Sequence, residues 1–144
     1  MPYCTLADIL ERIPEKIVIQ LTDDERIGVI DQVKVDAAVA RADKEIDAWC
    51  GGRYSVPFAE PPAVIRELSA DLAVYHLYAR KVDKIPETRI DGQKNALRLL
   101  EKIGDGKVSL GVAQMPPAAP AAVSGGASFV APNRIFTRDK LKDM

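Results

Sequence analysis

Apolar side chains recur along much of the chain at the three- and four-residue spacing that marks one face of an α-helix. From about Gln32 to Cys50 the sequence is rich in alanine and contains neither proline nor glycine, which favours a long helix. Gly51 and Gly52 follow at once and tolerate the left-handed conformation that closes many helices. The apolar positions on the predicted inner face are Val35, Val39, Ala42, Ile46 and Trp49.

The same spacing predicts two further helices. Pro62 suits the first turn of one of them. The other begins at about Glu87 or Thr88 and ends where Gly104 and Gly106 break the pattern. The buried stripe of the first comprises Ile65, Leu68, Leu72, Tyr75, Ala79 and Val82, and that of the second comprises Ala96, Leu99, Leu100 and Ile103.

The start of the chain carries weaker signals. Thr5 and Asp8 have the spacing of a helix cap, and the short helix that they open should stop before Pro14. Residues 17–20 are apolar and mostly β-branched over only four positions, which predicts a buried extended connector.

The connectors between the long helices are also predicted from local patterns. Thr22 and Glu25 have the spacing of a capping box, which predicts a further short helical turn. Residues 53–62 contain three prolines and should form an extended connector, and residues 107–110 are expected to form one extended segment.

These elements predict an all-α fold, a compact bundle of about four main helices with short connectors and an extended C-terminal arm. The helical domain should span residues 1–110, a size sufficient for one hydrophobic core. The predicted core contains Ile46, Trp49, Ile65, Leu68, Leu72, Tyr75, Leu99 and Ile103.

Beyond Gly111 the composition changes to proline, alanine, glycine and serine, which cannot offset the entropy of ordering by burial of large apolar groups. We therefore expect a flexible linker over residues 111–127 and a C-terminal docking arm over residues 128–144, packed either on its own domain or on a neighbour's. The arm's hypothetical partner or oligomer interface consists of Phe129, Val130, Arg134, Ile135, Phe136, Arg138 and Leu141.

Charge separates the two parts. Residues 1–110 hold 16 basic and 19 acidic side chains, whereas residues 111–144 hold four basic and two acidic ones. The whole chain has a net charge of −1, which disfavours a protein whose main task is to grip phosphates. A basic arm is suited to an acidic neighbour, including another copy of the chain. No apolar run reaches bilayer length and the start lacks a leader pattern, so the expected location is a cytoplasm without membrane contact.

Residues able to support catalysis or metal binding are few, and the sequence favours a structural use for each. Cys4 and Cys50 lack the spacing of a redox or zinc site. His76 has no second histidine or nearby cysteine, so it is expected to be a packed or partly exposed helix residue. Asp43 and Asp47 lie on one helical face and could bind a cation or share a proton, but neutralisation is favoured. The basic residues expected to neutralise them are Arg41, Lys44 and Arg53.

Two other patterns resemble ligand sites only superficially. The string GDGKV at residue 104 lacks the length and the hydroxyl residue of a phosphate-binding loop, so its glycines are expected to end a helix. Tyr54, Tyr75 and Tyr78 could form a base-stacking platform, but without a basic groove core packing is favoured. We expect no catalytic residue, no bound metal and no cofactor.

Four residues are expected to hold the bend after the helix that ends at Cys50. Asp47 and Arg53 could form a charged pair there, while Tyr54 and Pro57 would fix the crossing loop.

Taken in order, six segments of the chain resemble the head-tail adaptor family of Mu-like bacteriophages and prophages. They are YCTLADIL, LTDD, ARADKEIDAWCGGRYSVPF, ELSADLAVYHLYAR, KVSLG and RIFTRDKL. The most specific part runs from Ile46 and Asp47 through an aromatic to Arg53, Tyr54 and Pro57, and the terminal Arg134, Phe136 and Leu141 add to it. Trp49 and Cys50 depart from the family pattern, which more often has tyrosine and leucine there.

The resemblance implies a structural virion protein with no enzyme activity. Such a protein adds to the portal vertex after packaging and builds a ring, expected to have twelve copies, at the neck between head and tail. Its partners are the portal, other neck or tail-completion proteins and further copies of itself, while DNA passes through without sequence-specific binding. It is assembled in the host bacterial cytoplasm.

Two rivals remain from other classes. Short helices joined by turns could form a helical DNA-binding regulator of a prophage, which would need a basic recognition helix. A small hydrolase or metal enzyme would use Asp43, Asp47 and His76. Binding of duplex DNA and metal analysis of the purified protein separate these rivals from an adaptor.

Overall fold

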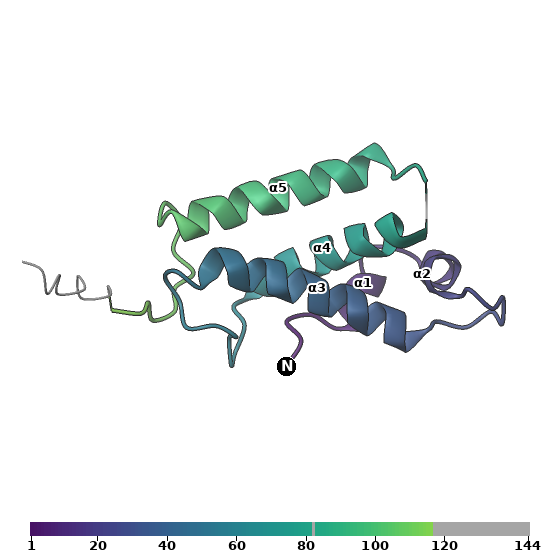
Figure 1. Ribbon diagram of the computed structural model, residues 1–144, viewed down its shortest axis with the longest axis horizontal. Helices are drawn as coiled ribbons and strands as arrows, with labels where there is room; N and C mark the ends of the chain where they lie inside the picture. Colours follow the sequence, from purple (N-terminus) through teal and green to yellow (C-terminus); the bar gives the residue numbers. More distant parts are fainter. Residues whose placement is uncertain (82, 117–144) are drawn as a thin grey trace, which may run out of the picture.

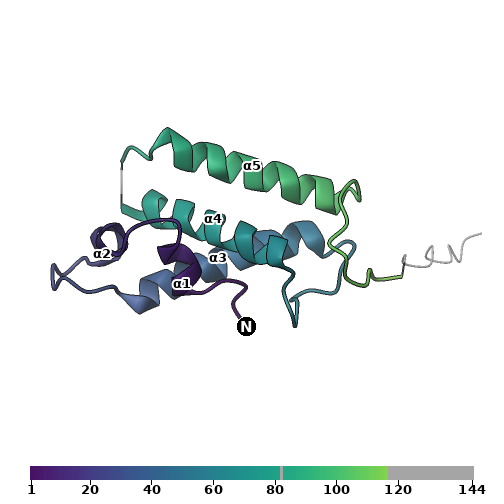
Figure 2. The same ribbon diagram turned by 180° about the vertical axis from the view of Figure 1, so that it is seen from behind.

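The computed structural model describes residues 1–81 and 83–116, and over that part of the chain every named element is a helix. The helices run in the order α1 (Leu6–Leu10), α2 (Glu15–Thr22), α3 (Gln32–Cys50), α4 (Ala63–Lys81) and α5 (Glu87–Gly104). Three long helices lie side by side, and α2 crosses them steeply at one end (Figures 1 and 2). The predicted all-α bundle is therefore confirmed.

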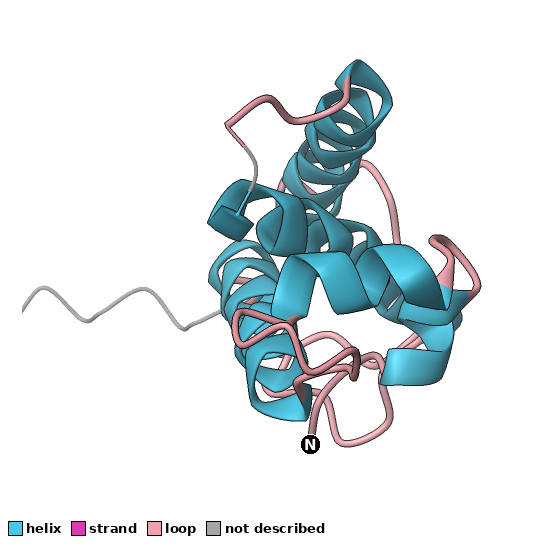
Figure 3. Cartoon of the chain, turned by 90° about the vertical axis from the view of Figure 1, so that its right-hand side faces the viewer, coloured by secondary structure: helices cyan, strands magenta, loops and turns pink. Residues whose placement is uncertain are grey.

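Helix α4 is central, because it contacts each of the other four helices. Its sequence explains this position: small residues such as Ser69, Ala70 and Ala73 let neighbouring backbones approach, and larger ones such as Leu72 and Leu77 fill the space between them. The end-on view shows helices joined by loops among the described residues (Figure 3), and α1, α2, α3 and α5 each pack against α4. None of these helices in the described residues is long and apolar enough to cross a membrane.

The ends of the helices agree with several local predictions. The backbone N–H of Thr5 donates to Asp8 over 2.7 Å, which caps α1 as expected. Arg12, just beyond α1, donates to Glu67 and, over 2.6 Å, to Asp71, so the short helix is tied to α4. Ile9, on the inner side of α1, is fully buried. The local cap and this long-range tie together hold a helix too short to be stable alone.

The extended connector predicted for residues 17–20 is wrong, because these residues lie inside α2. Their β-branched side chains favour strands only weakly, and burial of Val18, Leu21 and Thr22 at helical spacing decides the conformation instead. The capping box expected at Thr22 and Glu25 is also wrong. Thr22 ends α2, and its hydroxyl donates to the carbonyl of Val18 over 2.8 Å.

Two details after α3 and α5 differ from the predictions. Gly51 is right-handed, with φ −61, and a Cβ there would lie 2.8 Å from the carbonyl oxygen of Asp47, so close approach and not handedness requires glycine. Residues 107–110 form no strand. The one isolated β-bridge of the described residues joins Tyr54 to Gln114 instead.

The core prediction is confirmed for five residues and wrong for Trp49, whose side chain is 43% exposed. Cys50 is buried in its place, because the stripe of α3 advances by four residues after Ile46 and not by three. Tyr75 and Leu99 are only partly buried. The predicted core residues found buried are Ile46, Ile65, Leu68, Leu72 and Ile103.

Candidate functional site

The N-terminal segment is fixed to the bundle by a polar cluster built around Tyr3, whose side chain is 2% exposed. Its backbone N–H donates to Asp43 over 3.0 Å and its hydroxyl donates to Asp47, both on α3. The hydroxyl also accepts the backbone N–H of Phe58 over 3.0 Å, which ties in the connector between α3 and α4. Burial, reinforced by the Asp47 contact, raises the pKa of the Tyr3 hydroxyl. Tyr3 thus joins three separate segments.

Asp43 and Asp47 do share one side of α3, as their spacing requires, but their partners differ from those predicted. Arg41, Lys44 and Arg53 form no ion pair with them in the described part of the chain, and Tyr3 binds both. Arg41 and Lys44 are exposed and Arg53 binds Gln114 instead, whereas the neutral hydroxyl of Tyr3 can be buried at lower cost. Sequence reasoning missed Tyr3 because it lies 40 or more residues away along the chain.

Ser69 completes this cluster from α4. Its hydroxyl, which is fully buried, donates to Asp43 over 2.6 Å and lies 3.2 Å from the sulfur of Cys4. Burial raises the pKa of the Asp43 carboxyl, although the bonds from Ser69 and Tyr3 oppose the effect. Burial also raises the pKa of the Cys4 thiol to about 11, so this cysteine is a weak nucleophile at neutral pH.

A groove of about 630 Å³ opens beside the cluster, between the N-terminal segment and the first half of α3. Leu6, Val39 and Ala40 give it an apolar lining, and Asp36 and Asp43 add two carboxyl groups. No group of three or more histidine, cysteine, aspartate or glutamate residues with the arrangement of a metal site occurs in residues 1–81 and 83–116. The groove is therefore suited to an apolar or cationic segment.

His76 lies apart from this groove. It is 6% exposed on α4, and its Nε2 lies 3.1 Å from Oε1 of Glu45 without the alignment of a hydrogen bond. Burial lowers the pKa of the imidazole, and Arg41 lowers it further, while Glu45 raises it. The structure thus does not bring His76 together with Asp43 and Asp47, as the rival hydrolase would need. Its ring packs edge-on against Tyr75 with centroids 5.7 Å apart.

The bend after α3 is held by a clasp that we define as Arg53, Tyr54 and Gln114. The Tyr54 hydroxyl accepts the backbone N–H of Leu110 over 3.1 Å, and the Arg53 carbonyl accepts that of Met115 over 2.8 Å. Arg53 also donates to the side-chain oxygen of Gln114 over 2.9 Å. The residues after α5 are thereby fixed to the end of α3.

The charged pair expected between Asp47 and Arg53 is wrong, because Asp47 binds Tyr3 and Arg53 binds Gln114. Tyr54 is 1% exposed and does lie at the bend, next to Phe58, and a cis peptide bond joins Val56 to Pro57. The partners of Arg53 and Tyr54 come from residues 110–115, more than 55 residues away along the chain, so no local spacing predicts them.

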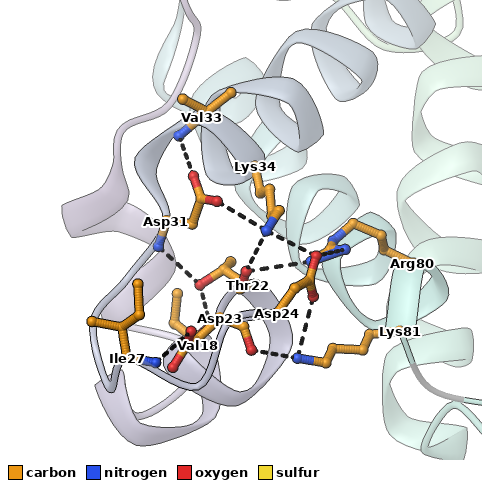
Figure 4. A network of polar contacts seen from close by, with 10 residues as sticks. All are labelled: Val18, Thr22, Asp23, Asp24, Ile27, Asp31, Val33, Lys34, Arg80 and Lys81. Atoms are coloured by element: carbon orange, nitrogen blue, oxygen red, sulfur yellow. Dashed lines mark hydrogen bonds and ion pairs between the residues drawn. The ribbon is translucent and has the colours of Figure 1, made fainter.

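Residues 23–31 form a loop at the opposite end of the bundle (Figure 1), which we call the rigid loop because hydrogen bonds and ion pairs hold it in place (Figure 4). Asp24 receives two bonds from Arg80, of 3.0 and 2.8 Å, and lies 2.8 Å from the Lys34 ammonium group. Asp23 accepts the backbone N–H groups of two loop residues, over 3.0 and 2.6 Å. These bonds lower the pKa of both carboxyl groups.

This polar network holds apolar side chains in solvent. Ile27 is 65% exposed, Val29 58% and Val33 76%, all at or beside the loop. Sequence analysis missed the surface because it expected a helical turn there. The predicted arm interface, Phe129, Val130, Arg134, Ile135, Phe136, Arg138 and Leu141, lies outside the described residues.

Comparison with known proteins agrees with the phage resemblance. The family model described as Bacteriophage Mu, Gp36 matches residues 3–128. A Mu-like prophage protein, FluMu protein gp36 of Haemophilus influenzae, is 29% identical over 110 residues, which cover 76% of each chain. The family match spans the polar cluster, the clasp, the rigid loop and all of the groove lining except Met1 and Pro2. The chain belongs to the Bacteriophage Mu Gp36 family.

Proposed function

We propose that this protein is a head-tail adaptor, a structural virion component that forms a ring on the portal vertex and joins the DNA-filled head to the tail. The observation that carries the proposal is the family match over residues 3–128, which identifies the chain as a Mu-type phage protein. No enzyme activity is needed for this role, and the buried groups of the cluster serve to hold segments together.

Three features of the described residues support an assembly role. The rigid loop keeps Ile27, Val29 and Val33 in solvent, and side chains of this kind gain most when a partner buries them. The ion pairs of Figure 4 hold the loop in one conformation before any partner binds, so binding costs little conformational entropy in this loop. The acidic excess of residues 1–110 weakens attachment to DNA, which suits a ring that a genome must slide through.

In the proposed ring, one surface of a copy meets a different surface of the next, because closed rings are built from such head-to-tail contacts. We propose twelve copies in the virion and contacts to the portal and to other neck or tail-completion proteins. The C-terminal arm, residues 128–144, supplies the docking anchors, with Phe136 and Leu141 as its large apolar side chains.

The test uses phage particles produced with variants of the arm. Phe136→Ser combined with Leu141→Ser removes the anchors and should abolish the joining of tails to filled heads. Val123→Ser, a matched apolar-to-polar change before the arm, should leave particle yield unchanged. Electron microscopy counts joined and tailless heads. Normal yield from the anchor variant would contradict docking by the arm, and specific, salt-dependent binding of duplex DNA would favour a regulator instead.

A further inference from the structure

The groove beside the N-terminal segment has an apolar lining that the polar cluster does not use, and it shares only Cys4 and Asp43 with the bonds of that cluster. Its volume of about 630 Å³ lies in the range of sites that hold ligands the size of a few side chains. Leu6, Val39 and Ala40 offer apolar contact, and the carboxyl groups of Asp36 and Asp43 stand at its lining. A fitting occupant therefore carries apolar side chains with positive charges close by.

One segment of the chain outside the described residues has this composition. Residues 129–142 combine apolar side chains, among them Ile135 and Phe136, with four basic residues and one acidic residue. The body formed by residues 1–110 carries an excess of three negative charges. Attraction between a basic segment and an acidic body favours their encounter, while apolar burial supplies most of the affinity.

The position of the last described residues brings this segment within reach. The clasp holds Met115 against Arg53, at the end of α3. Ala40, in the groove, lies ten residues before Cys50, the last residue of that helix, a distance of about 15 Å along its axis. The twelve residues 117–128 can span up to about 40 Å. The segment can therefore enter the groove of its own chain, where its effective concentration is on the order of millimolar.

We propose that the groove lined by Leu6, Val39 and Ala40 is the docking site for the chain's own C-terminal segment, residues 129–142. Apolar side chains around Phe136 fill the groove, and arginine or lysine groups lie next to Asp36. The inference concerns the isolated protein and does not depend on the adaptor role. Within that role, the docked segment is released when the neck offers a competing surface.

The test compares two exposed alanines of α3 in the full-length chain. Ala40 lines the groove and Ala37 does not. Ala40→Arg therefore fills the groove and repels the basic segment, while Ala37→Arg adds the same charge outside the groove. Backbone ¹⁵N relaxation should give residues 129–142 order close to that of the helices in the wild type and in Ala37→Arg. In Ala40→Arg the order parameters should fall below about 0.6. Free motion in the wild type, or unchanged order in Ala40→Arg, would overturn the proposal.

A second variant leaves the body untouched. Ile135→Ser combined with Phe136→Ser should shift the amide resonances of Leu6, Val39 and Ala40, while those of the rigid loop stay in place. The order of residues 129–142 should also be independent of protein concentration over a tenfold dilution, since docking is within one chain. Loss of order on dilution would show that a neighbouring copy supplies the segment and would contradict the assignment.

Discussion

Replacing Tyr3 with phenylalanine removes one hydroxyl and should destabilise the whole domain. The change keeps the ring, which packs edge-on against Phe58 with centroids 5.7 Å apart, and breaks two bonds of the hydroxyl. One of these leads to the carboxylate of Asp47, and a hydrogen bond to a charged group contributes about 1.5–3 kcal/mol. The other satisfies the backbone N–H of Phe58, in a connector where Phe58 itself is buried.

The unfolding free energy should therefore fall by about 2.5–6 kcal/mol in Tyr3→Phe, because the lost bond to Asp47, about 1.5–3 kcal/mol, and the unpaired N–H, about 1–3 kcal/mol, add together. Tyr75→Phe is the matched control. Tyr75 is only partly buried, and its hydroxyl makes no hydrogen bond within residues 1–81 and 83–116, so its loss should change stability by less than about 0.5 kcal/mol.

Urea denaturation followed by circular dichroism measures both variants, and the m-value shows whether the native state stays compact. A double-mutant cycle with Asp47→Asn isolates the Tyr3–Asp47 contact, and the two changes should be clearly non-additive. A Tyr3→Phe protein as stable as the wild type would refute the view that this hydroxyl ties the N-terminal segment to α3 and the following connector.

Three further changes test other parts of the structure. The pKa of the His76 imidazole is lower in the folded protein than in the unfolded chain, so below about pH 6.5 protonation favours unfolding and the wild type loses stability as pH falls. His76→Leu should lose this dependence of the unfolding free energy on pH, and equal pH curves for the two proteins would contradict this. Gly106→Ala should destabilise the protein by about 1–2 kcal/mol, since φ is +81 and a Cβ would lie 1.8 Å from the Arg53 guanidinium. Gly92→Ala, inside α5 with open space around it, should stabilise the protein by about 0.5–1 kcal/mol. Unfolding in guanidinium chloride measures both changes in free energy and shows their opposite signs. Leu72→Ala should cost about 2–5 kcal/mol by the same assay because the side chain is fully buried; a loss below 1 kcal/mol would place α4 outside the core.

The long helices were predictable because each repeats its apolar spacing over many turns. Helix α3 was placed from Gln32 to Cys50, the bounds that the structure gives. With a period of 3.6 residues, the next buried position after Ile46 can lie three or four residues further on, so the spacing alone does not decide between Trp49 and Cys50. In the structure Cys50 is buried and Trp49 is 43% exposed, and α5 passes so close to this turn that a Cβ at Gly104 would lie 2.9 Å from the carbonyl oxygen of Trp49.

The wrong predictions concern segments whose conformation depends on residues that are distant in the sequence. Residues 17–20 are β-branched, and only their burial in the bundle makes them helical. The loop after Thr22 is fixed by Lys34, Arg80 and Lys81, which come from two other helices. Local sequence patterns contain no information about such partners, so the rigid loop could not be anticipated.

The candidate site divides in the same way. The spacing of Asp43 and Asp47 correctly placed two carboxyl groups on one side of α3, but their partners Tyr3 and Ser69 are 26 to 44 residues away. One signal was available: two acidic residues beside an apolar stripe need buried donors, and neutral hydroxyls are the least costly ones. The groove next to them lies between the N-terminal segment and α3, and local sequence patterns do not predict how that segment runs across the helix.

The central claim, that the protein is an adaptor which fastens head to tail, is tested most directly by its mass alone and after mixing with the portal of the same phage. Native mass spectrometry should detect a ring of adaptor copies on the portal, twelve in number, and electron microscopy should place that ring at the neck of intact particles. Failure to join the portal or any other neck component, with normal joining of heads and tails in its absence, would contradict the claim.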